Sequence, residues 1–240
     1  MTQEAIVKMK TKIFADGADK EAILALYKKP YIKGFTTNPT LMHKAGITNY
    51  AQFAHDILKE IPDRPFSFEV FADEMPEMER QALTIATWGK NVYVKIPITN
   101  TRGDSAKELI KKLSAQGLRL NITAITTLDQ VRNIITCFSG SPSSYISIFA
   151  GRIADTGVDP YELMREAVQI LKPYPNLELI WASPRELLNV FHAEKIGCHI
   201  ITVTPDILKK LDLVGKDLTE YSLDTVKMFY EDGRKSGFTL

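Results

Sequence analysis

The chain alternates between two patterns of apolar residues. Short runs rich in β-branched and aromatic residues are bounded by turn or cap residues, which is typical of buried strands. The strands predicted in this way are Lys12–Ala15, Ile32–Thr36, Phe66–Phe71, Asn91–Ile96, Leu118–Ile122, Tyr145–Ala150, Leu177–Ala182 and Cys198–Val203. The segments between them place apolar residues three or four positions apart, which predicts amphipathic helices. These helices are Lys20–Tyr27, Asn49–Ile61, Pro76–Trp88, Asp104–Ala115, Thr127–Phe138, Pro160–Leu171, Pro184–Lys195, a short one from Pro205 to Leu211, and a final one at 219–236.

Eight strands, each followed by a helical segment, are the elements of a (β/α)₈ TIM barrel. The strands recur every ~27 residues, close to the spacing of a barrel of ~250 residues. A doubly wound open sheet is the alternative, but it usually shows a Gly-rich loop after its first strand, and none follows Asp16. No low-complexity linker interrupts the chain. We therefore expect one α/β barrel domain over residues 1–240, with an extra C-terminal helix.

Composition and charge narrow the partners. The chain has 240 residues, of which 45% are apolar, and a net charge of +1 without a basic tract, so no nucleic-acid partner is expected. No apolar stretch reaches the ~18 residues of a membrane span, and the N-terminus lacks a signal-peptide core. We expect a cytoplasmic protein that does not bind membranes. The two cysteines and four histidines show no metal-ligand spacing, so no metal site is predicted.

One charged residue lies in an unusual place. Lys95 is inside Val92–Ile98, an otherwise apolar run that predicts a buried strand. Burying an ammonium without a partner is costly, so lysine is rarely placed there for stability. Burial disfavours the charged form of an amine, and a neutral amine attacks carbonyl carbons. Lys95 is therefore a candidate Schiff-base nucleophile. The alternative is a lysine that reaches solvent or pairs with a carboxylate.

Polar residues gather where the predicted strands end, which is where barrel enzymes hold their catalytic groups. They are Asp16, Asn38, Glu69, Lys95, Asn121 and Thr123, Ser147 and Arg152, and Ser183 and Arg185, with Thr202 and Thr204 less distinctive after the eighth strand. One polar strand end carries little information. Seven in succession predict a ring of side chains around one mouth.

The residue types in this ring suggest aldol chemistry on a sugar phosphate. Lys95 could form an iminium, and the carboxylates Asp16 and Glu69 could move protons. Amides and hydroxyls suit a polyhydroxylated chain, and the two arginines suit a phosphate. A helix that begins at Pro184 would add backbone donors to this anion site.

Each of these residues also has a purely structural interpretation. Asp16 could cap a helix, and Asn38 could be a turn residue before proline. Glu69 could form a structural ion pair with the strand lysine, and Arg152 could pair with Asp155 on the surface.

The motifs around the ring are similar to those of a known family. They are Phe-Ala-Asp16, Gly34-Phe-Thr-Thr-Asn38-Pro-Thr, Phe68-Glu69-Val, Val94-Lys95-Ile-Pro-Ile-Thr, Leu120-Asn121-Ile-Thr123, Ser147-Ile-Phe149-Ala-Gly-Arg152-Ile and Ala182-Ser183-Pro-Arg185. From Phe14 to Val203 the chain resembles the transaldolase family, in the short form shared with fructose-6-phosphate aldolases. The resemblance implies a (β/α)₈ barrel with the Schiff-base lysine on the fourth strand, where Lys95 lies.

The resemblance also implies roles for the other ring residues. Asp16 would be the acid/base at the C4 hydroxyl, and Glu69 and Thr123 would hold a water that relays protons. The substrate would be bound by Asn38, Asn121, Ser147, Phe149, Arg152, Ser183 and Arg185, the last three at the phosphate.

The implied reaction transfers a dihydroxyacetone unit from fructose 6-phosphate or sedoheptulose 7-phosphate to an aldose phosphate, without a metal or organic cofactor. The aldolase branch tends to carry Gln and Tyr where this chain has Glu69 and Phe149, which favours the transferase. A lyase that releases free dihydroxyacetone is one alternative. A transaldolase for a related phosphorylated or sulfonated ketose is another, because Trp181 and Pro184 depart from the residues usual in the family. A third alternative is a non-catalytic protein that binds sugar phosphates.

The final helix resembles the segment with which short members hold a neighbouring subunit in pentamers or decamers. Its Val226, Phe229 and Tyr230 stripe suits that contact, so a homo-oligomer is expected. Packing on its own barrel is an equally open alternative.

Overall fold

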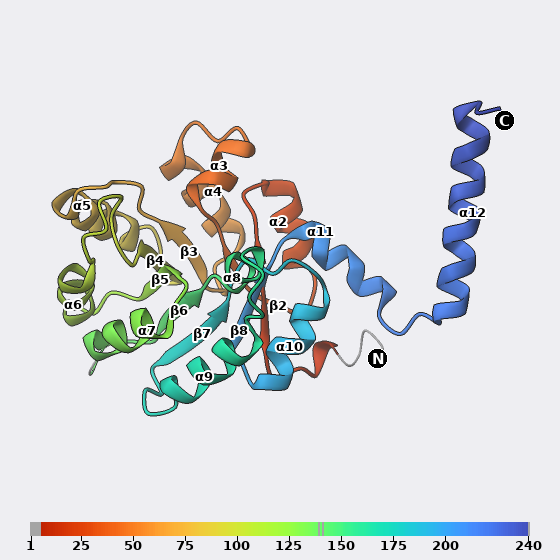
Figure 1. Ribbon diagram of the computed structural model, residues 1–240. Helices are drawn as coiled ribbons and strands as arrows, with labels where there is room; N and C mark the ends of the chain where they lie inside the picture. Colours follow the sequence, from red (N-terminus) through yellow and green to blue (C-terminus); the bar gives the residue numbers. More distant parts are fainter. Residues whose placement is uncertain (1–5, 139, 141, 240) are drawn as a thin grey trace.

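The protein folds around a closed parallel β-barrel (Figure 1). The computed structural model describes residues 6–138, 140 and 142–239. The strands pair in sequence order, and β8 pairs with β1 to close the barrel. They are β1 (Lys12–Asp16), β2 (Ile32–Thr36), β3 (Phe66–Glu69), β4 (Val92–Pro97), β5 (Leu120–Ile125), β6 (Ser144–Ile148), β7 (Leu177–Trp181) and β8 (Ile200–Val203). The predicted (β/α)₈ architecture is confirmed.

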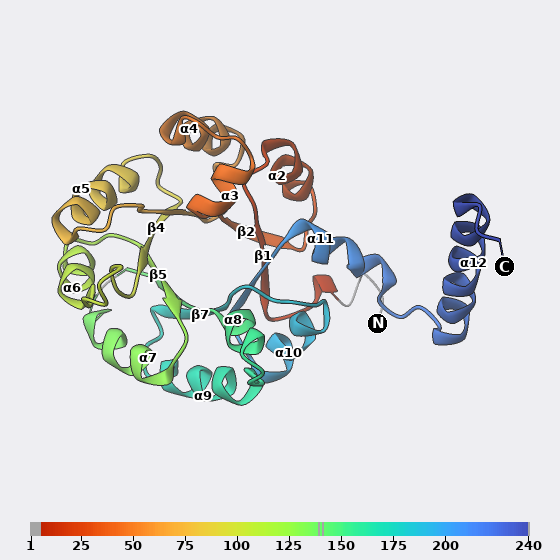
Figure 2. The ribbon, with the colours of Figure 1, turned by 45° about the horizontal axis from the view of Figure 1, so that its top comes forward.

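Helices form an outer layer around the strands (Figure 2). The helices around the barrel are α2 (Lys20–Tyr27), α3 (Pro39–Lys44), α4 (Tyr50–Glu60), α5 (Met75–Ala86), α6 (Lys107–Ala115), α7 (Leu128–Ile135), α8 (Ala150–Asp155), α9 (Tyr161–Leu171), α10 (Leu188–Ile196) and α11 (Pro205–Leu208), with 3₁₀ turns η1 (Thr136–Phe138) and η2 (Lys209–Leu213). A further helix, α12 (Leu218–Ser236), lies apart from this layer (Figure 2). Except in α12, the apolar faces that gave the helical pattern are buried against the barrel.

The barrel interior is filled below the polar ring. Side chains alternate between the two faces of a strand, so Phe14 and Tyr93 face the same way as Asp16 and Lys95, two residues further on. Tyr93 stacks on Tyr145 with ring centroids 4.0 Å apart. Only glycine fits at position 34, because a Cβ there would lie 2.6 Å from the Phe14 ring. The aromatic layer closes the barrel below and leaves the polar ring at the carboxyl ends of the strands.

Two predicted strands end two residues earlier than expected. β3 ends at Glu69 rather than Phe71, because beyond Val70 the backbone N–H groups of Phe71 and Ala72 donate to the Gln81 side chain at 2.9 and 3.0 Å instead of to a strand. β6 ends at Ile148 because Phe149 is the N-cap of α8.

The sequence analysis also missed two short helices, α3 and α8, each of which directly follows a strand end. Helices this short carry too few residues to show a 3.6-residue period.

The helix predicted at 184–195 begins later than expected. The residues Pro184 to Leu187 form bends and a turn, and α10 begins only at Leu188. The Asn189 side chain accepts hydrogen bonds from the backbone N–H groups of Arg185 at 2.9 Å and Glu186 at 3.2 Å. The prediction that backbone donors of a helix starting at Pro184 face an anion is therefore wrong.

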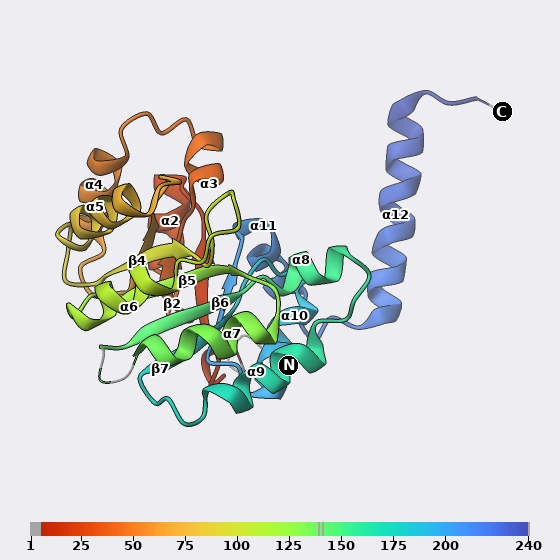
Figure 3. The same cartoon turned by 60° about the vertical axis from the view of Figure 1, so that its left-hand side comes forward.

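The predicted C-terminal helix is present as α12. Asp217 caps it by accepting from the backbone N–H groups of Thr219 and Glu220. None of its residues is buried, and the helix stands away from the barrel in two views (Figures 1 and 3). The single domain predicted over 1–240 includes residues 1–5, 139, 141 and 240, which lie outside the described residues.

Among the described residues, no helix is long and apolar enough to cross a bilayer. The cytoplasmic location stays a prediction.

Candidate active site

Lys95 lies inside the barrel, near the end of β4. Its side chain is 7% exposed, and its Nζ lies 3.0 Å from Oε2 of Glu69, which is 16% exposed on the neighbouring strand β3. Nζ also donates to the backbone oxygen of Thr37 at 3.3 Å. Lys95 and Glu69 are direct partners in the β3–β4 register, so the two side chains point to the same face. The lysine is thus buried and paired with a carboxylate, and it does not reach solvent.

Asp16 is the second carboxylate of the site and ends β1. Burial raises its pKa above the ordinary value, and the nearby Glu69 charge acts in the same direction. The Lys95 ammonium and a hydrogen bond from Thr36 partly oppose this rise in pKa. The N-cap of α2 is Asp19, not Asp16. The carboxylate of Asp16 is therefore free of the capping role that the sequence allowed.

Two threonines on neighbouring strands support Asp16. The Thr36 hydroxyl donates to Oδ1 of Asp16 at 2.7 Å. The Thr36 and Thr202 hydroxyl oxygens are 2.5 Å apart. Because the Thr36 proton is directed at the carboxylate, the proton between the two hydroxyls comes from Thr202. The result is a directed chain from β8 through β2 to the Asp16 carboxylate on β1.

A second buried network holds Asn121 on β5. The Asn121 amide donates to Ser67 Oγ at 3.0 Å, and Ser147 Oγ donates to the Asn121 carbonyl oxygen at 2.6 Å. All three residues are buried. Asn121 is also the register partner of Lys95. The network therefore fixes the amide beside the lysine, with hydrogen bonds to strands on both sides.

Thr123 is buried near the end of β5, and its hydroxyl has no hydrogen-bond partner among the described residues. The buried Thr37 hydroxyl likewise has no hydrogen-bond partner in the described part of the chain. An unpaired buried hydroxyl is costly, so each suits a bound water or substrate oxygen.

Asn38 and Phe149 both occupy N-cap positions of helices at the barrel mouth. The side-chain oxygen of Asn38 caps α3 by accepting from the backbone N–H of Leu41 at 2.9 Å, so Asn38 is a helix cap and not merely the turn residue that the structural interpretation allowed. The amide nitrogen of Asn38 is not used in this cap. Phe149 packs against the aromatic layer that fills the barrel.

The residues predicted for the anion site lie on two segments that touch. A Cβ at Gly151 on α8 would lie 1.5 Å from the backbone oxygen of Ser183 and 3.2 Å from Nε of Arg185, so α8 is packed directly against the loop after β7. Ser183 has a left-handed backbone, with φ of 56°, which fixes the direction of this loop. Arg152 is the residue after Gly151 on α8.

Arg185 is held in place by Asp155 on α8. Its Nε donates to Oδ1 of Asp155 at 2.9 Å, and its Nη2 contacts Oδ2. Arg185 holds the pKa of Asp155 below its ordinary value. The surface pair expected for Arg152 with Asp155 is therefore formed by Arg185 instead. Both partners are about half exposed, so solvent weakens the pair and an incoming anion can compete for the guanidinium.

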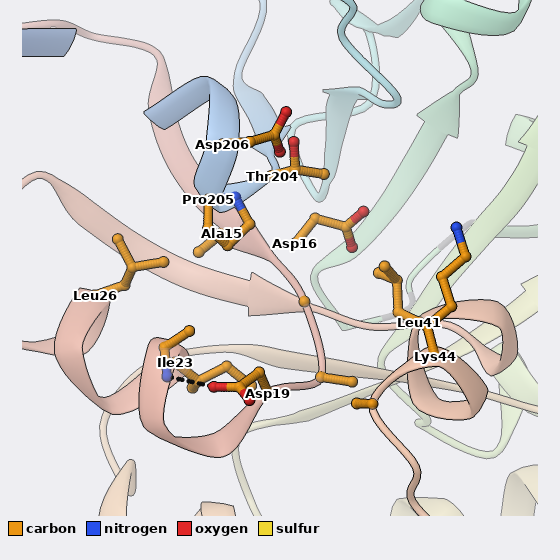
Figure 4. A pocket seen from close by; sticks show the side chains of 14 residues that line it. Ala15, Asp16, Asp19, Ile23, Leu26, Leu41, Lys44, Thr204, Pro205 and Asp206 are labelled. Atoms are coloured by element: carbon orange, nitrogen blue, oxygen red, sulfur yellow. Dashed lines mark hydrogen bonds between the residues drawn. The ribbon is translucent and has the colours of Figure 1, made fainter. Parts of the chain in front are cut away.

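A cavity of about 370 Å³ opens beside Asp16, between β1 and the helices α2, α3 and α11 (Figure 4). Asp19, Lys44 and Asp206 border it together with apolar side chains. Among the described residues, no group of three or more His, Cys, Asp or Glu side chains is placed to hold a metal ion.

The structure thus brings five of the predicted residues together at the carboxyl ends of the strands. Lys95, Asp16 and Glu69 interact with one another, and Asn121 with Ser147 adjoins them. The sequence analysis did not select Thr36 and Ser67 as site residues. Ser67 lies two positions before Glu69 on the same face of β3, and this spacing is the signal that could have found it. Thr36 is the last residue of β2 and the register partner of Asp16, which only the strand pairing reveals.

The barrel is similar to solved structures of other enzymes. One is the orotidine 5'-monophosphate decarboxylase from Metallosphaera sedula, with a TM-score of 0.54 and 12% identity over 88% of this chain and 98% of that one. At this identity the likeness shows the fold alone. The fold and the site together define a TIM-barrel protein with a buried lysine and two carboxylates at the ends of its strands.

Sequence comparisons identify the family. The model of the Transaldolase/Fructose-6-phosphate aldolase family matches residues 13–240, and the chain belongs to this family. A probable transaldolase from Streptococcus equi subsp. zooepidemicus is 36% identical over 92% of this chain and 97% of the relative. Another from Dehalococcoides mccartyi is 35% identical over 83% of this chain and 89% of the relative. Family membership supports an enzyme of the transferase or aldolase kind.

Proposed function

We propose that the chain is a transaldolase that carries a dihydroxyacetone unit as a Schiff base on Lys95. The observation that carries this proposal is the burial of the Lys95 amine within 3.0 Å of Glu69, beside Asp16. The names of the similar proteins, probable transaldolases, support the transferase.

The first half of the reaction forms the iminium. Glu69 lies within hydrogen-bond reach of Nζ and accepts the proton that Lys95 must lose before it attacks. The neutral amine adds to the C2 ketone of fructose 6-phosphate, and water leaves as the iminium forms. Thr123, whose buried hydroxyl is unpaired, holds this water together with Glu69.

The second half breaks and remakes a carbon–carbon bond. Asp16 takes the proton of the C4 hydroxyl, and the electrons of the C3–C4 bond move into the iminium to give an enamine. Glyceraldehyde 3-phosphate leaves, and the enamine adds to an aldose phosphate such as erythrose 4-phosphate. The same residues then reverse their roles, and hydrolysis releases sedoheptulose 7-phosphate.

The remaining site residues bind the two ends of the substrate. Asn38, Asn121 and Ser147 hold the hydroxyls of the three-carbon unit. Arg152, Ser183 and Arg185 hold the phosphate, for which two guanidinium groups supply charge-assisted hydrogen bonds. Phe149 forms an apolar wall, which favours retention of the enamine until the acceptor arrives.

Borohydride trapping tests the Schiff base. The protein is incubated with fructose 6-phosphate and borohydride, and the labelled peptide is identified by mass spectrometry. We expect one reduced adduct, on Lys95, and none in Lys95→Arg. Lys44→Arg is the matched control, because Lys44 also borders the region beside Asp16, and it should label as the unchanged protein does. An adduct on another lysine would overturn the site assignment.

A coupled assay separates the transferase from the lyase. We expect glyceraldehyde 3-phosphate to form rapidly from fructose 6-phosphate only when erythrose 4-phosphate is present. Equal rates with and without the acceptor would favour the dihydroxyacetone-releasing aldolase. Replacing the donor by a sulfonated ketose tests the remaining alternative of the same class.

We also propose that α12 packs on a neighbouring copy in a homo-oligomer, a pentamer or decamer by resemblance to short family members. Its exposed apolar residues Leu223, Val226, Phe229 and Tyr230 are 52 to 65% exposed, and a contiguous apolar surface of this kind marks an interaction site. Phe229→Glu should lower the mass measured by light scattering, whereas Lys227→Glu on the same helix should not. An unchanged mass in Phe229→Glu would contradict the proposal.

A further inference from the structure

Tyr50 lies in the layer behind the candidate active site. It is the first residue of α4, and its ring packs among aromatic side chains. The ring centroids lie 6.1 Å from Phe68, 6.0 Å from Phe71 and 5.3 Å from Trp88. This packing fixes the ring and aims its hydroxyl at the last residue of β3.

The hydroxyl of Tyr50 makes two hydrogen bonds to the backbone of Glu69. It accepts from the Glu69 N–H at 2.8 Å and donates to the Glu69 carbonyl oxygen at 3.0 Å. Burial raises the pKa of the Tyr50 phenol, which therefore stays protonated and can donate and accept at once.

These two bonds replace a missing strand. Successive residues of β3 direct their backbone groups first to one neighbouring strand and then to the other. The Val70 N–H donates to the backbone oxygen of Lys95 on β4, whereas the Ser67 carbonyl oxygen accepts from the Thr37 N–H just after β2. The backbone N–H and carbonyl groups of Glu69 therefore face the β2 side. However, β2 ends at Thr36, and the chain turns into α3 at Pro39, which has no N–H to donate. Without Tyr50, both backbone groups of Glu69 would lack a partner.

The position of this backbone sets the position of the Glu69 carboxylate. That carboxylate is the ion-pair partner of Lys95 at 3.0 Å, and proton transfer needs this distance to stay within hydrogen-bond reach. A residue at the end of a strand, with one side unpaired, would be free to move away from the lysine.

We propose that Tyr50 is a positioning residue, which holds Glu69 within proton-transfer distance of Lys95 by completing the β3 edge that β2 leaves open. The hydrogen bonds that the structure gives Tyr50 reach Glu69 and not Lys95, so Tyr50 acts through Glu69. The inference rests on the proposed Schiff-base function.

Tyr50→Phe tests the proposal, because it keeps the aromatic packing and removes only the hydroxyl. We expect kcat to fall by about 10-fold, as is typical when a supporting hydrogen bond of a catalytic group is lost. KM for fructose 6-phosphate should stay within about twofold, because the binding residues are unchanged. The rate is expressed per Lys95 site trapped by borohydride, so that unfolded protein does not contribute.

Two further variants make the test specific. Tyr27→Phe is the matched control: its hydroxyl also makes a side-chain hydrogen bond, to Asp63 at 2.7 Å, but far from the lysine. The kcat of Tyr27→Phe should equal that of the unchanged protein. In a Glu69→Gln background, Tyr50→Phe should lower kcat by less than about twofold more, because Tyr50 acts through Glu69.

The outcomes distinguish the possible errors. An unchanged kcat per trapped site in Tyr50→Phe, or a full 10-fold loss on top of Glu69→Gln, would overturn the positioning role while the Schiff base stands. Absence of any adduct on Lys95 in the unchanged protein would overturn the proposed function and this inference together. A loss of kcat that disappears in the Glu69→Gln background supports the proposal.

Discussion

Replacing Thr36 by valine should move the pH dependence of the reaction. Valine has the shape of threonine but cannot donate the 2.7 Å hydrogen bond to Oδ1 of Asp16. That bond lowers the Asp16 pKa against the rise caused by burial, so its loss raises the pKa further. In the proposed reaction Asp16 must be ionised to accept the C4 hydroxyl proton. The acidic limb of the pH–rate profile should therefore move to higher pH.

The size of the shift follows from the strength of the bond. A hydrogen bond to a charged group contributes about 1.5–3 kcal/mol, and the lower value suits a partly buried pair. One pKa unit corresponds to about 1.4 kcal/mol, so the limb should move by about one pH unit. The charged groups that face Asp16, Lys95 and Glu69, are unchanged in the variant and keep their opposing effects.

The same variant should also lose folding stability, and this loss should be present at high pH and disappear at low pH. At a pH above the raised pKa of Asp16, where the carboxylate is ionised, it loses a partner in the folded state only, so the variant should be less stable by about 1.5 kcal/mol. Because burial already raises the folded-state pKa of Asp16, this loss should disappear as the pH falls below that pKa and the carboxyl is protonated.

The assay is kcat/KM for fructose 6-phosphate against pH, which reports ionisations of the free enzyme. Thr36→Ser keeps the hydroxyl and should keep the limb in place. Thr202→Val removes the more distant hydroxyl of the chain and should shift the limb less than Thr36→Val does. An acidic limb at the same pH in Thr36→Val and in the unchanged protein would refute the role given to the hydrogen bond from Thr36 to Asp16.

Three other predictions concern the lysine, the anion site and the packing of α8. Lys95→Arg should abolish turnover without unfolding the protein, since guanidinium forms no iminium; turnover retained at a tenth of the original rate would contradict the mechanism. Arg185→Gln should raise KM for fructose 6-phosphate by about 10-fold, the value of one charge-assisted hydrogen bond, and leave KM for unphosphorylated fructose unchanged; equal effects on both sugars would remove the phosphate from this site. Gly151→Ala should lower the free energy of unfolding by about 3 kcal/mol, because its Cβ would lie 1.5 Å from the Ser183 oxygen, and denaturant titration would show an unchanged midpoint if the contact could relax.

The candidate site was predictable as far as it depends on strand ends. Lys95, Glu69 and Asn121 lie on the interior face because side chains alternate along a strand, and neighbouring strands bring these three into register. The roles of Arg185 and Asn38 were less predictable. Arg185 is held by Asp155, which lies 30 residues away in the sequence, on α8. Asn38 caps α3, a helix too short to show a periodic pattern of apolar residues.

Hydrophobic periodicity alone determined the barrel, because eight buried strands with intervening amphipathic helices leave few other ways to cover both faces of a parallel sheet. It also determined which residues could reach one mouth. Only the tertiary structure decided which carboxylate faces the lysine, that Thr36 and Thr202 support Asp16, and that Tyr50 completes the edge beside Glu69. These contacts join residues far apart in the chain. Their distances depend on where each strand stops and how each helix packs, which local patterns do not record.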